Sequence, residues 1–100
     1  MREGATNDPK EIARVESVTL YPPEILIQGL GGEQSLLAIA KYSDGTDRDI
    51  TDLAVFFSSD EGVAKVDGSG TLSAISRGES FITARFETQT VGVPVLVLPN

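Results

Sequence analysis

Residues 35–46 read Ser-Leu-Leu-Ala-Ile-Ala-Lys-Tyr-Ser-Asp-Gly-Thr, and they carry the clearest structural signal in the chain. Because successive side chains of a β-strand point to opposite faces, the stretch up to Tyr42 divides into two parities. We expect one parity to face a core, and it holds Leu36, Ala38, Ala40 and Tyr42. The other parity would then point outward with Leu37, Ile39 and Lys41. Since Asp and Gly favour turns, the Asp44-Gly45 pair predicts that the strand ends in a hairpin turn.

Short β-forming segments surround this strand on both sides. Toward the N-terminus, residues 15–20 and 25–27 are separated by Pro22-Pro23. A double proline cannot lie in mid-sheet, so it predicts a break in an edge strand. Toward the C-terminus, strands are predicted at residues 55–58, 63–66, 71–75, 80–86 and 91–97, the last of them interrupted by Gly92 and Pro94.

No segment keeps a helical period, and about seven short strands recur at intervals of roughly 8–12 residues. This spacing predicts an all-β fold, a sandwich of two sheets. The alternative is a closed barrel of the oligonucleotide-binding type, which usually has about five longer strands and a basic, aromatic binding face. Only eight basic residues stand against fifteen acidic ones, which argues against the barrel.

The composition excludes several classes of function. The chain has no cysteine and no histidine, so it lacks disulfides, the usual general base and the commonest metal ligand. Its net charge of −7 argues against nucleic acid and anionic membranes as partners. No stretch approaches the ~18 apolar residues of a membrane span. We therefore expect no enzyme activity, no cofactor and no membrane insertion.

One hundred residues is the size of a single domain. Residues 1–13 are polar and charged and are predicted to be a flexible tail or linker, and residues 14–100 form the domain. The N-terminal residues lack the apolar core of a signal peptide. We interpret the chain as a piece of a longer protein and expect the isolated domain to be a monomer.

Several segments together resemble one family, the bacterial immunoglobulin-like domains of group 2. The resemblance covers roughly residues 15–98. It rests on residues 36–46 with Asp49-Ile50-Thr51, on Phe57-Ser58-Ser59-Asp60, on Val63-Ala64-Lys65-Val66-Asp67, on residues 70–74 and on residues 78–84. Each segment alone is weak, whereas their order and spacing are specific. The family usually has Trp where this chain has Phe57, a departure that should not change the fold.

The resemblance implies an immunoglobulin-like β-sandwich from an exported or surface-exposed bacterial protein. Such domains often occur in tandem, as in intimin-like and invasin-like adhesins, and they also accompany catalytic or electron-transfer domains without being enzymes. The expected role is a structural spacer or an adhesion module. The alternative is a module that binds a surface protein or a glycan. Glycan sites usually expose Trp or Tyr, and this chain has no Trp and two tyrosines, Tyr21 and Tyr42, expected in the core.

Immunoglobulin domains with a disulfide bridge their two sheets beside a buried Trp. The corresponding strands here carry Ala38 and Ala84, so we expect Phe57 to fill the gap between the sheets. On this interpretation Phe57→Ala should cost ~3–5 kcal/mol. The predicted core comprises Phe57, Leu36, Ala38, Tyr42, Val66, Leu72, Ile82 and Ala84.

Two further features are candidate sites. An acidic loop could supply oxygen ligands to Ca²⁺ from Asp44, Asp47, Asp49 and Asp52, although its spacing is not that of a helix-flanked calcium loop and simple turn formation is the favoured interpretation. Asp60 and Asp67 are also expected to be turn carboxylates. Strand parity predicts four outward-facing apolar residues, Phe56, Phe81, Leu37 and Ile39, with Arg85 beside Phe81. They would either be covered by loops or the N-terminal segment or contact a neighbouring domain.

Overall fold

The computed structural model describes residues 13–99, and these residues form ten β-strands and no helix. The strands are β1 (Val15–Tyr21), β2 (Ile25–Gln28), β3 (Glu33–Ser35), β4 (Leu37–Tyr42), β5 (Asp47–Asp49), β6 (Val55–Ser58), β7 (Ala64–Val66), β8 (Thr71–Ala74), β9 (Gly78–Phe86) and β10 (Gln89–Leu98). The predicted all-β class is confirmed. No helix of this part of the chain is long and apolar enough to cross a membrane.

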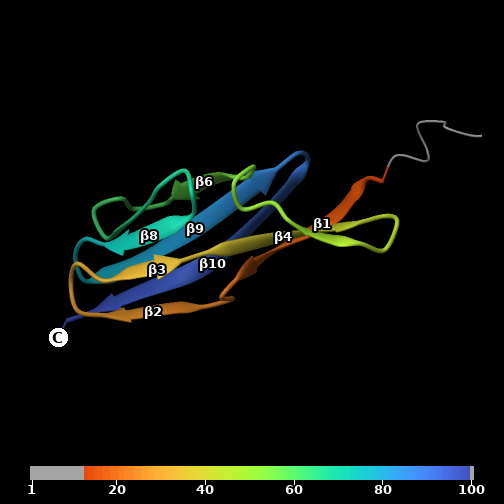
Figure 1. Ribbon diagram of the computed structural model, residues 1–100. Coiled ribbons are helices and arrows are strands. Elements are labelled where there is room, and N and C mark those ends of the chain that lie inside the picture. The colour runs from red at the N-terminus through yellow and green to blue at the C-terminus, as the bar shows by residue number, and fades with distance from the viewer. Residues whose placement is uncertain (1–12, 100) are drawn as a thin grey trace, which may run out of the picture.

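The strands lie in two layers (Figure 1). One layer is the four-stranded sheet β2-β10-β9-β6. The other contains two three-stranded sheets, β1-β4-β5 and β3-β8-β7. Because β3 and β4 are separated only by Leu36, whose backbone N–H donates to the carbonyl of Gly70 at 2.8 Å, these two sheets follow one another along the same layer. The predicted strand at residues 35–42 is therefore broken at its first apolar residue.

The double proline marks the point where the chain changes layers. Before it, β1 pairs antiparallel with β4, with Leu20 opposite Ala38. After it, β2 pairs parallel with β10, with Ile25 opposite Val95. This confirms the predicted break, because proline cannot donate a ladder hydrogen bond and suits a residue between two pairings.

The last strand is continuous, contrary to the interruption predicted at Gly92 and Pro94. Pro94 lies opposite Phe81 of β9. The backbone N–H and C=O of Phe81 both bond to Ser59 on the opposite side of β9, so Pro94 need not donate to Phe81. On the other flank of Pro94 the pairing with β2 begins only at Val95. The missing N–H of Pro94 therefore leaves the ladder intact.

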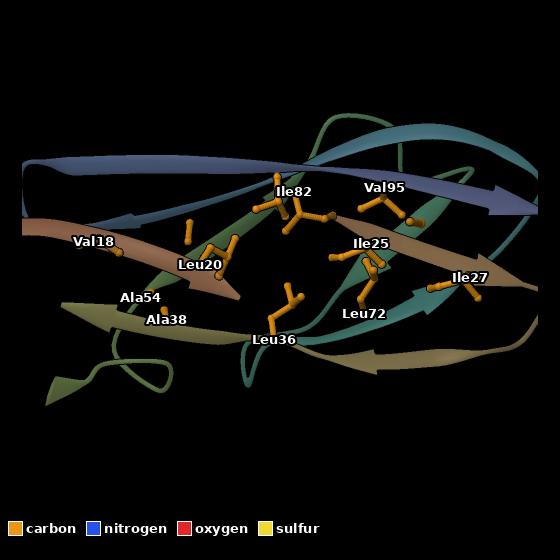
Figure 2. Packing of buried hydrophobic residues seen from close by; sticks show 14 of the residues in the cluster. Val18, Leu20, Ile25, Ile27, Leu36, Ala38, Ala54, Leu72, Ile82 and Val95 are labelled. Carbon is orange, nitrogen blue, oxygen red and sulfur yellow. The ribbon is translucent and has the colours of Figure 1, made fainter. Parts of the chain in front are cut away.

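The core lies between the two layers and is mainly aliphatic. Figure 2 shows Leu36 of one layer and Ile82 of the other pointing toward each other. Of the predicted core residues, five are buried and two are half-buried against the core: Leu36, Ala38, Leu72, Ile82 and Ala84, then Tyr42 and Val66. The expectation for Tyr21 was wrong, because that side chain is 46% exposed.

The predicted placement of the two adjacent phenylalanines was also wrong. Phe57 is 46% exposed, whereas Phe56 is half-buried and packs against the core. The cause is the register of β6 on β9, which sets Phe56 opposite the buried Ala84 and Phe57 opposite Thr83. Phe57 therefore does not fill the space between the sheets, and the cost of ~3–5 kcal/mol expected for Phe57→Ala no longer applies.

The two ends of the described chain lie at opposite ends of the sandwich (Figure 1). At the N-terminal end, the backbone N–H of Arg14 donates to Ser43 Oγ at 2.9 Å, and the N–H of Ser43 donates to the carbonyl of Arg14 at 2.7 Å. At the other end, the N–H of Gly29 donates to the carbonyl of Leu98 at 2.8 Å. Most of the predicted tail, residues 1–12, lies outside the described residues.

Candidate interaction surface

Exposed apolar side chains gather on the side of the β2-β10-β9-β6 sheet that faces away from the core, here called the outer face. Leu26 of β2 is 63% exposed, and large apolar side chains of the three other strands are also exposed. They alternate with buried residues of the same strands, so the pleat directs them outward. The apolar members of the outer face are Leu26, Val55, Phe57, Phe81, Pro94 and Leu96.

The Phe81 ring lies across the outer face over Gly92 of the neighbouring strand. A Cβ atom on Gly92 would approach ring carbon Cε2 of Phe81 to 3.0 Å, closer than ordinary contacts allow. Glycine at this position therefore lets the aromatic ring lie against the backbone of β10. The result is a low, broad apolar surface. A larger residue at position 92 would push the Phe81 ring away from the sheet.

A hollow of about 710 Å³ opens beside Phe81, toward the C-terminal end of the sandwich. Its lining combines apolar side chains with two carboxylates and includes Glu24, Leu26, Glu79, Phe81, Pro94 and Leu96. Such a lining suits an apolar group that carries a positive charge.

A row of four outward-facing residues on β9 carries opposite charges at its two ends. The row is Glu79, Phe81, Thr83 and Arg85. The guanidinium carbon of Arg85 lies 5.6 Å from the centroid of the Phe57 ring, a cation–π distance. Arg85 was predicted to lie beside Phe81, and in the structure its guanidinium lies over the ring of Phe57.

The outward-facing residues predicted from parity occupy different surfaces. Phe81 is exposed on the outer face, and β6 and β9 do pair. Leu37 is exposed and Ile39 half-buried on β4, which belongs to the other layer. Phe56 packs against the core and takes no part in either surface. The prediction missed Leu26, because β2 is apolar at three of its four positions and only its pairing with β10 shows which side faces outward. It also missed Leu96, although the shared face of the β10 valines directs Leu96 outward.

The four candidate calcium ligands are not gathered into a site. Asp44 accepts hydrogen bonds from the N–H of Thr46 at 3.0 Å and from its hydroxyl at 2.6 Å. Asp49 accepts the same pair of bonds from Thr51, at 2.9 and 2.6 Å. Asp47 and Asp52 are exposed, and within residues 13–99 no group of three or more acidic side chains could hold a metal ion. The calcium hypothesis therefore gains no support.

These carboxylates instead shape the turns. The hydroxyl of Thr46 is the main cause that lowers the pKa of Asp44, and the hydroxyl of Thr51 has the same effect on the pKa of Asp49. Part of the predicted acidic loop is the strand β5, which pairs with β4. Asp67 accepts bonds from the N–H groups of Ser69 and Thr71, both at 2.9 Å, as expected for a turn carboxylate.

A cluster of serine hydroxyls at the end of β6 is also structural. Ser58 Oγ donates to the carbonyl of Ala64 at 2.6 Å and lies 2.9 Å from Ser80 Oγ. Ser80 Oγ in turn accepts from the N–H of Asp60 at 3.2 Å. The hydroxyls are thus engaged with one another and with the backbone of the β6–β7 turn. Because the chain contains no histidine, none of these serines has an imidazole base to activate it.

The comparisons with known proteins agree with this architecture. No family model matches the chain. A stretch of 78 residues is 40% identical to Ice-binding protein 1 of Shewanella frigidimarina (strain NCIMB 400) and covers 78% of this chain. The chain spans only 9% of the length of that relative.

The solved structures similar to this chain include domains of the S-layer protein SbsC. Its domains 4 and 5 match with a TM-score of 0.72 at 21% identity, over 86% of this chain and 53% of that one. The longer rSbsC(31-844) matches with a TM-score of 0.73 at 21% identity, over 86% of this chain and 13% of that one. At 21% identity this likeness concerns the fold alone, which is a β-sandwich.

Proposed function

We propose that this chain is an immunoglobulin-like domain of group 2 that serves as a non-catalytic, force-resisting spacer in a longer exported or cell-surface bacterial protein. The motif order of residues 36–84 supports the family. The match to a small part of an ice-binding protein and to domains of an S-layer protein supports a place within a larger surface protein. We also propose residues 14–100 as the domain, since Arg14 already bonds to Ser43.

The observation that carries this proposal is the parallel pairing of β2 with β10. The pairing aligns Ile25, Leu26, Ile27 and Gln28 with Val95, Leu96, Val97 and Leu98. The chain enters at one end of the sandwich and leaves at the other (Figure 1). Tension between the two termini therefore pulls β2 and β10 along their length in opposite directions. In this shear geometry the hydrogen bonds of the pair share the load and must break together.

A second role is supported by the outer face. Its exposed apolar side chains suit a protein surface, so the domain can also act in adhesion or bind a protein for a neighbouring catalytic or electron-transfer domain. A glycan ligand stays an alternative, since Tyr21, Phe57 and Phe81 are all partly exposed.

Single-molecule pulling tests the spacer role. Since the chain has no cysteine, cysteines can be introduced as attachment points for the force. Attachment at Ala13→Cys and Pro99→Cys loads the β2–β10 pair in shear. Attachment at Leu30→Cys and Pro99→Cys loads the same pair from one end, so its bonds break one at a time. We expect the unfolding force to be several-fold higher in the first geometry, since forced unfolding is governed by the unfolding barrier along the pulled direction.

Both attachment pairs leave the β2–β10 hydrogen bonds unchanged, so thermal unfolding of the two variants is the control and should agree between them. Equal unfolding forces in the two geometries would contradict a mechanical role for the parallel pair.

A further inference from the structure

We propose that two copies of this chain associate face to face through their outer faces, with the strands of one copy antiparallel to those of the other. In this arrangement Glu79 of each copy meets Arg85 of the other. The proposal does not depend on the spacer role, since it concerns the side of the sandwich and not its ends.

The outer face holds a large share of the exposed apolar surface. Among residues 13–99, half of the exposed large hydrophobic side chains lie on it: Leu26, Val55, Phe57, Phe81 and Leu96. Side chains of this kind on adjacent strands form a contiguous patch, which marks a contact surface more strongly than scattered apolar residues do.

The charge pattern identifies the occupant as a second copy. Glu79 and Arg85 face outward from the same strand, six positions apart, which is about 20 Å at the rise of an antiparallel strand. Phe81 and Thr83 lie between them. A two-fold axis across the strand, midway between Phe81 and Thr83, turns this row onto itself in reverse order. Each Glu79 then faces the Arg85 of the other copy, so this row of β9 is complementary to itself.

The same pattern excludes a parallel arrangement. If the strands ran in the same direction with β9 over β9, Glu79 would face Glu79 and Arg85 would face Arg85. Like charges opposite each other are destabilising, so the row selects the antiparallel orientation. The remaining acidic charge of the two copies is largely screened, because the Debye length is about 8 Å at physiological ionic strength.

The shape of the outer face fits this orientation. Stacked sheets pack about 10 Å apart, and the Phe81 ring lying over Gly92 keeps the centre of the face low enough for such an approach. The hollow lined by Glu24 and Glu79 lies toward the C-terminal end of one copy. Reversal of the second copy brings its Arg85 to Glu79 at the edge of this hollow, which supplies the positive charge that the lining suits.

Sedimentation equilibrium of the 100-residue chain tests the proposal, with protein concentrations from micromolar to about 1 mM. The unchanged chain should form a dimer within this range, in contrast to the monomer expected from the sequence. Glu79→Arg and Arg85→Glu should each weaken the dimer by about tenfold or more, because each places like charges opposite each other. An equimolar mixture of the two single variants should recover the affinity of the unchanged chain, since every Glu–Arg pair is then re-formed across the heterodimer.

This rescue separates pairing between copies from effects within one copy. Residues 79 and 85 are too far apart on one strand to contact each other, so a gain on mixing requires contact between chains. Glu33→Arg, an exposed position on β3 in the other layer, makes the same change of charge and should leave dimerisation unaltered. Phe81→Ser should weaken the dimer strongly while it lowers the melting temperature of the monomer only slightly, because the Phe81 ring is half-exposed.

Three results would overturn the proposal. One is a chain that stays monomeric up to about 1 mM, which leaves the outer face to a partner of another kind. The second is a Glu33→Arg variant that weakens association as much as Glu79→Arg does. The third is a mixture of the two single variants that associates no better than either variant alone. None of these results bears on the pulling experiment, so the two proposals fail independently.

Discussion

The guanidinium of Arg85 lies over the ring of Phe57, with 5.6 Å between the guanidinium carbon and the ring centroid. The contact spans two neighbouring strands, since Arg85 lies opposite Val55 and Phe57 opposite Thr83. It covers one face of a ring that points away from the core. Of the two adjacent phenylalanines, the one that packs against the core is Phe56.

Because Phe56 packs against the core and Phe57 does not, the two substitutions to alanine should differ in their effect on stability. Phe56→Ala should lower the free energy of unfolding by about 3–4 kcal/mol, because it removes packing against the core. Phe57→Ala should lower it by only about 1–2 kcal/mol, from partial burial and the lost cation–π contact. Urea unfolding at neutral pH measures both. A larger loss for Phe57→Ala would mean that the register of β6 is shifted by one residue.

Thr51 offers a second test, because its hydroxyl is a buried link between two strands. The N–H of Ala38 donates to Thr51 Oγ1 at 2.9 Å, and this hydroxyl donates to Asp49 at 2.6 Å. Thr51→Val keeps the shape but leaves the N–H of Ala38 without its acceptor, so it should cost about 1–3 kcal/mol. The matched control is Thr46→Val, where the hydroxyl bonds to Asp44 in the same way but is exposed; it should cost at most about 1 kcal/mol. Equal losses in urea unfolding would contradict this account.

Alanine substitutions at two glycines distinguish the cost of backbone strain from the cost of crowding against neighbouring atoms. Gly45 and Gly70 have φ angles of 88° and 85°, so alanine at either should cost about 1–2 kcal/mol of strain. A Cβ on Gly45 meets nothing within 4 Å, whereas a Cβ on Gly70 lies 3.0 Å from Thr51 Cγ2 and 3.4 Å from Phe56 Cζ. Gly70→Ala should therefore destabilise the chain more than Gly45→Ala. Thermal unfolding of the pair measures the difference, and the reverse order would show that the turn at Gly70 is loosely packed.

Asp67 should contribute to the pH dependence of stability. Its pKa in the folded chain is lowered from the ordinary value of 3.8, first by the N–H of Thr71 and then by the hydroxyl of Ser69. Because the folded pKa is the lower one, this stabilisation is complete above the unfolded pKa and is lost as the pH falls through the folded pKa.

The variant Asp67→Asn cannot ionise and should be less stable than the unchanged chain at neutral pH. The two stability curves should converge as the pH falls from 7 to about 2, because protonation then removes the charge from Asp67 as well. Urea unfolding at several pH values measures the curves. A constant difference across the whole range would show that the Asp67 charge does not act through these hydrogen bonds.

Sequence patterns correctly predicted which side chains face the core in strands where apolar and polar residues alternate. They also predicted the turns that contain Asp-Gly. The strand after Ser35 shows buried Leu36, Ala38 and Ala40, and the valines of β10 lie on one face as expected. The turns at Asp44 and Asp67 are held by their own carboxylates. Local chemistry decides such features, so the sequence is sufficient to predict them.

The prediction of which β6 side chains face the core was wrong for a physical reason. Its four residues, Val-Phe-Phe-Ser, place one phenylalanine on each face, so hydrophobicity alone does not distinguish the faces. Val55 and Phe57 together are more apolar than Phe56 and Ser58, which favours the wrong parity. The hydroxyl of Ser58 reverses this preference, since it turns inward to bond to the carbonyl of Ala64 and to pair with Ser80. A local sequence pattern does not predict hydrogen bonds between residues that are separated in the sequence.

The outer face was predictable only in part for a similar reason. Phe81 was expected outside because β9 alternates, and the shared face of the β10 valines directs Leu96 outward as well, whereas Leu26 lies in a strand that is apolar on both sides. The direction of Leu26 depends on the parallel β2–β10 pairing, which joins residues about seventy positions apart.

The placement of the chain ends also limits how such a domain can be combined with others. A domain whose ends lie close together can be inserted into a surface loop of a host protein, and its chain can be permuted by joining those ends. This sandwich begins beside Ser43 and finishes beside Gly29, at opposite ends of its long direction (Figure 1). Gene duplication followed by in-frame fusion would therefore lengthen a protein by one sandwich at each step, whereas insertion into a compact host would require long connecting segments.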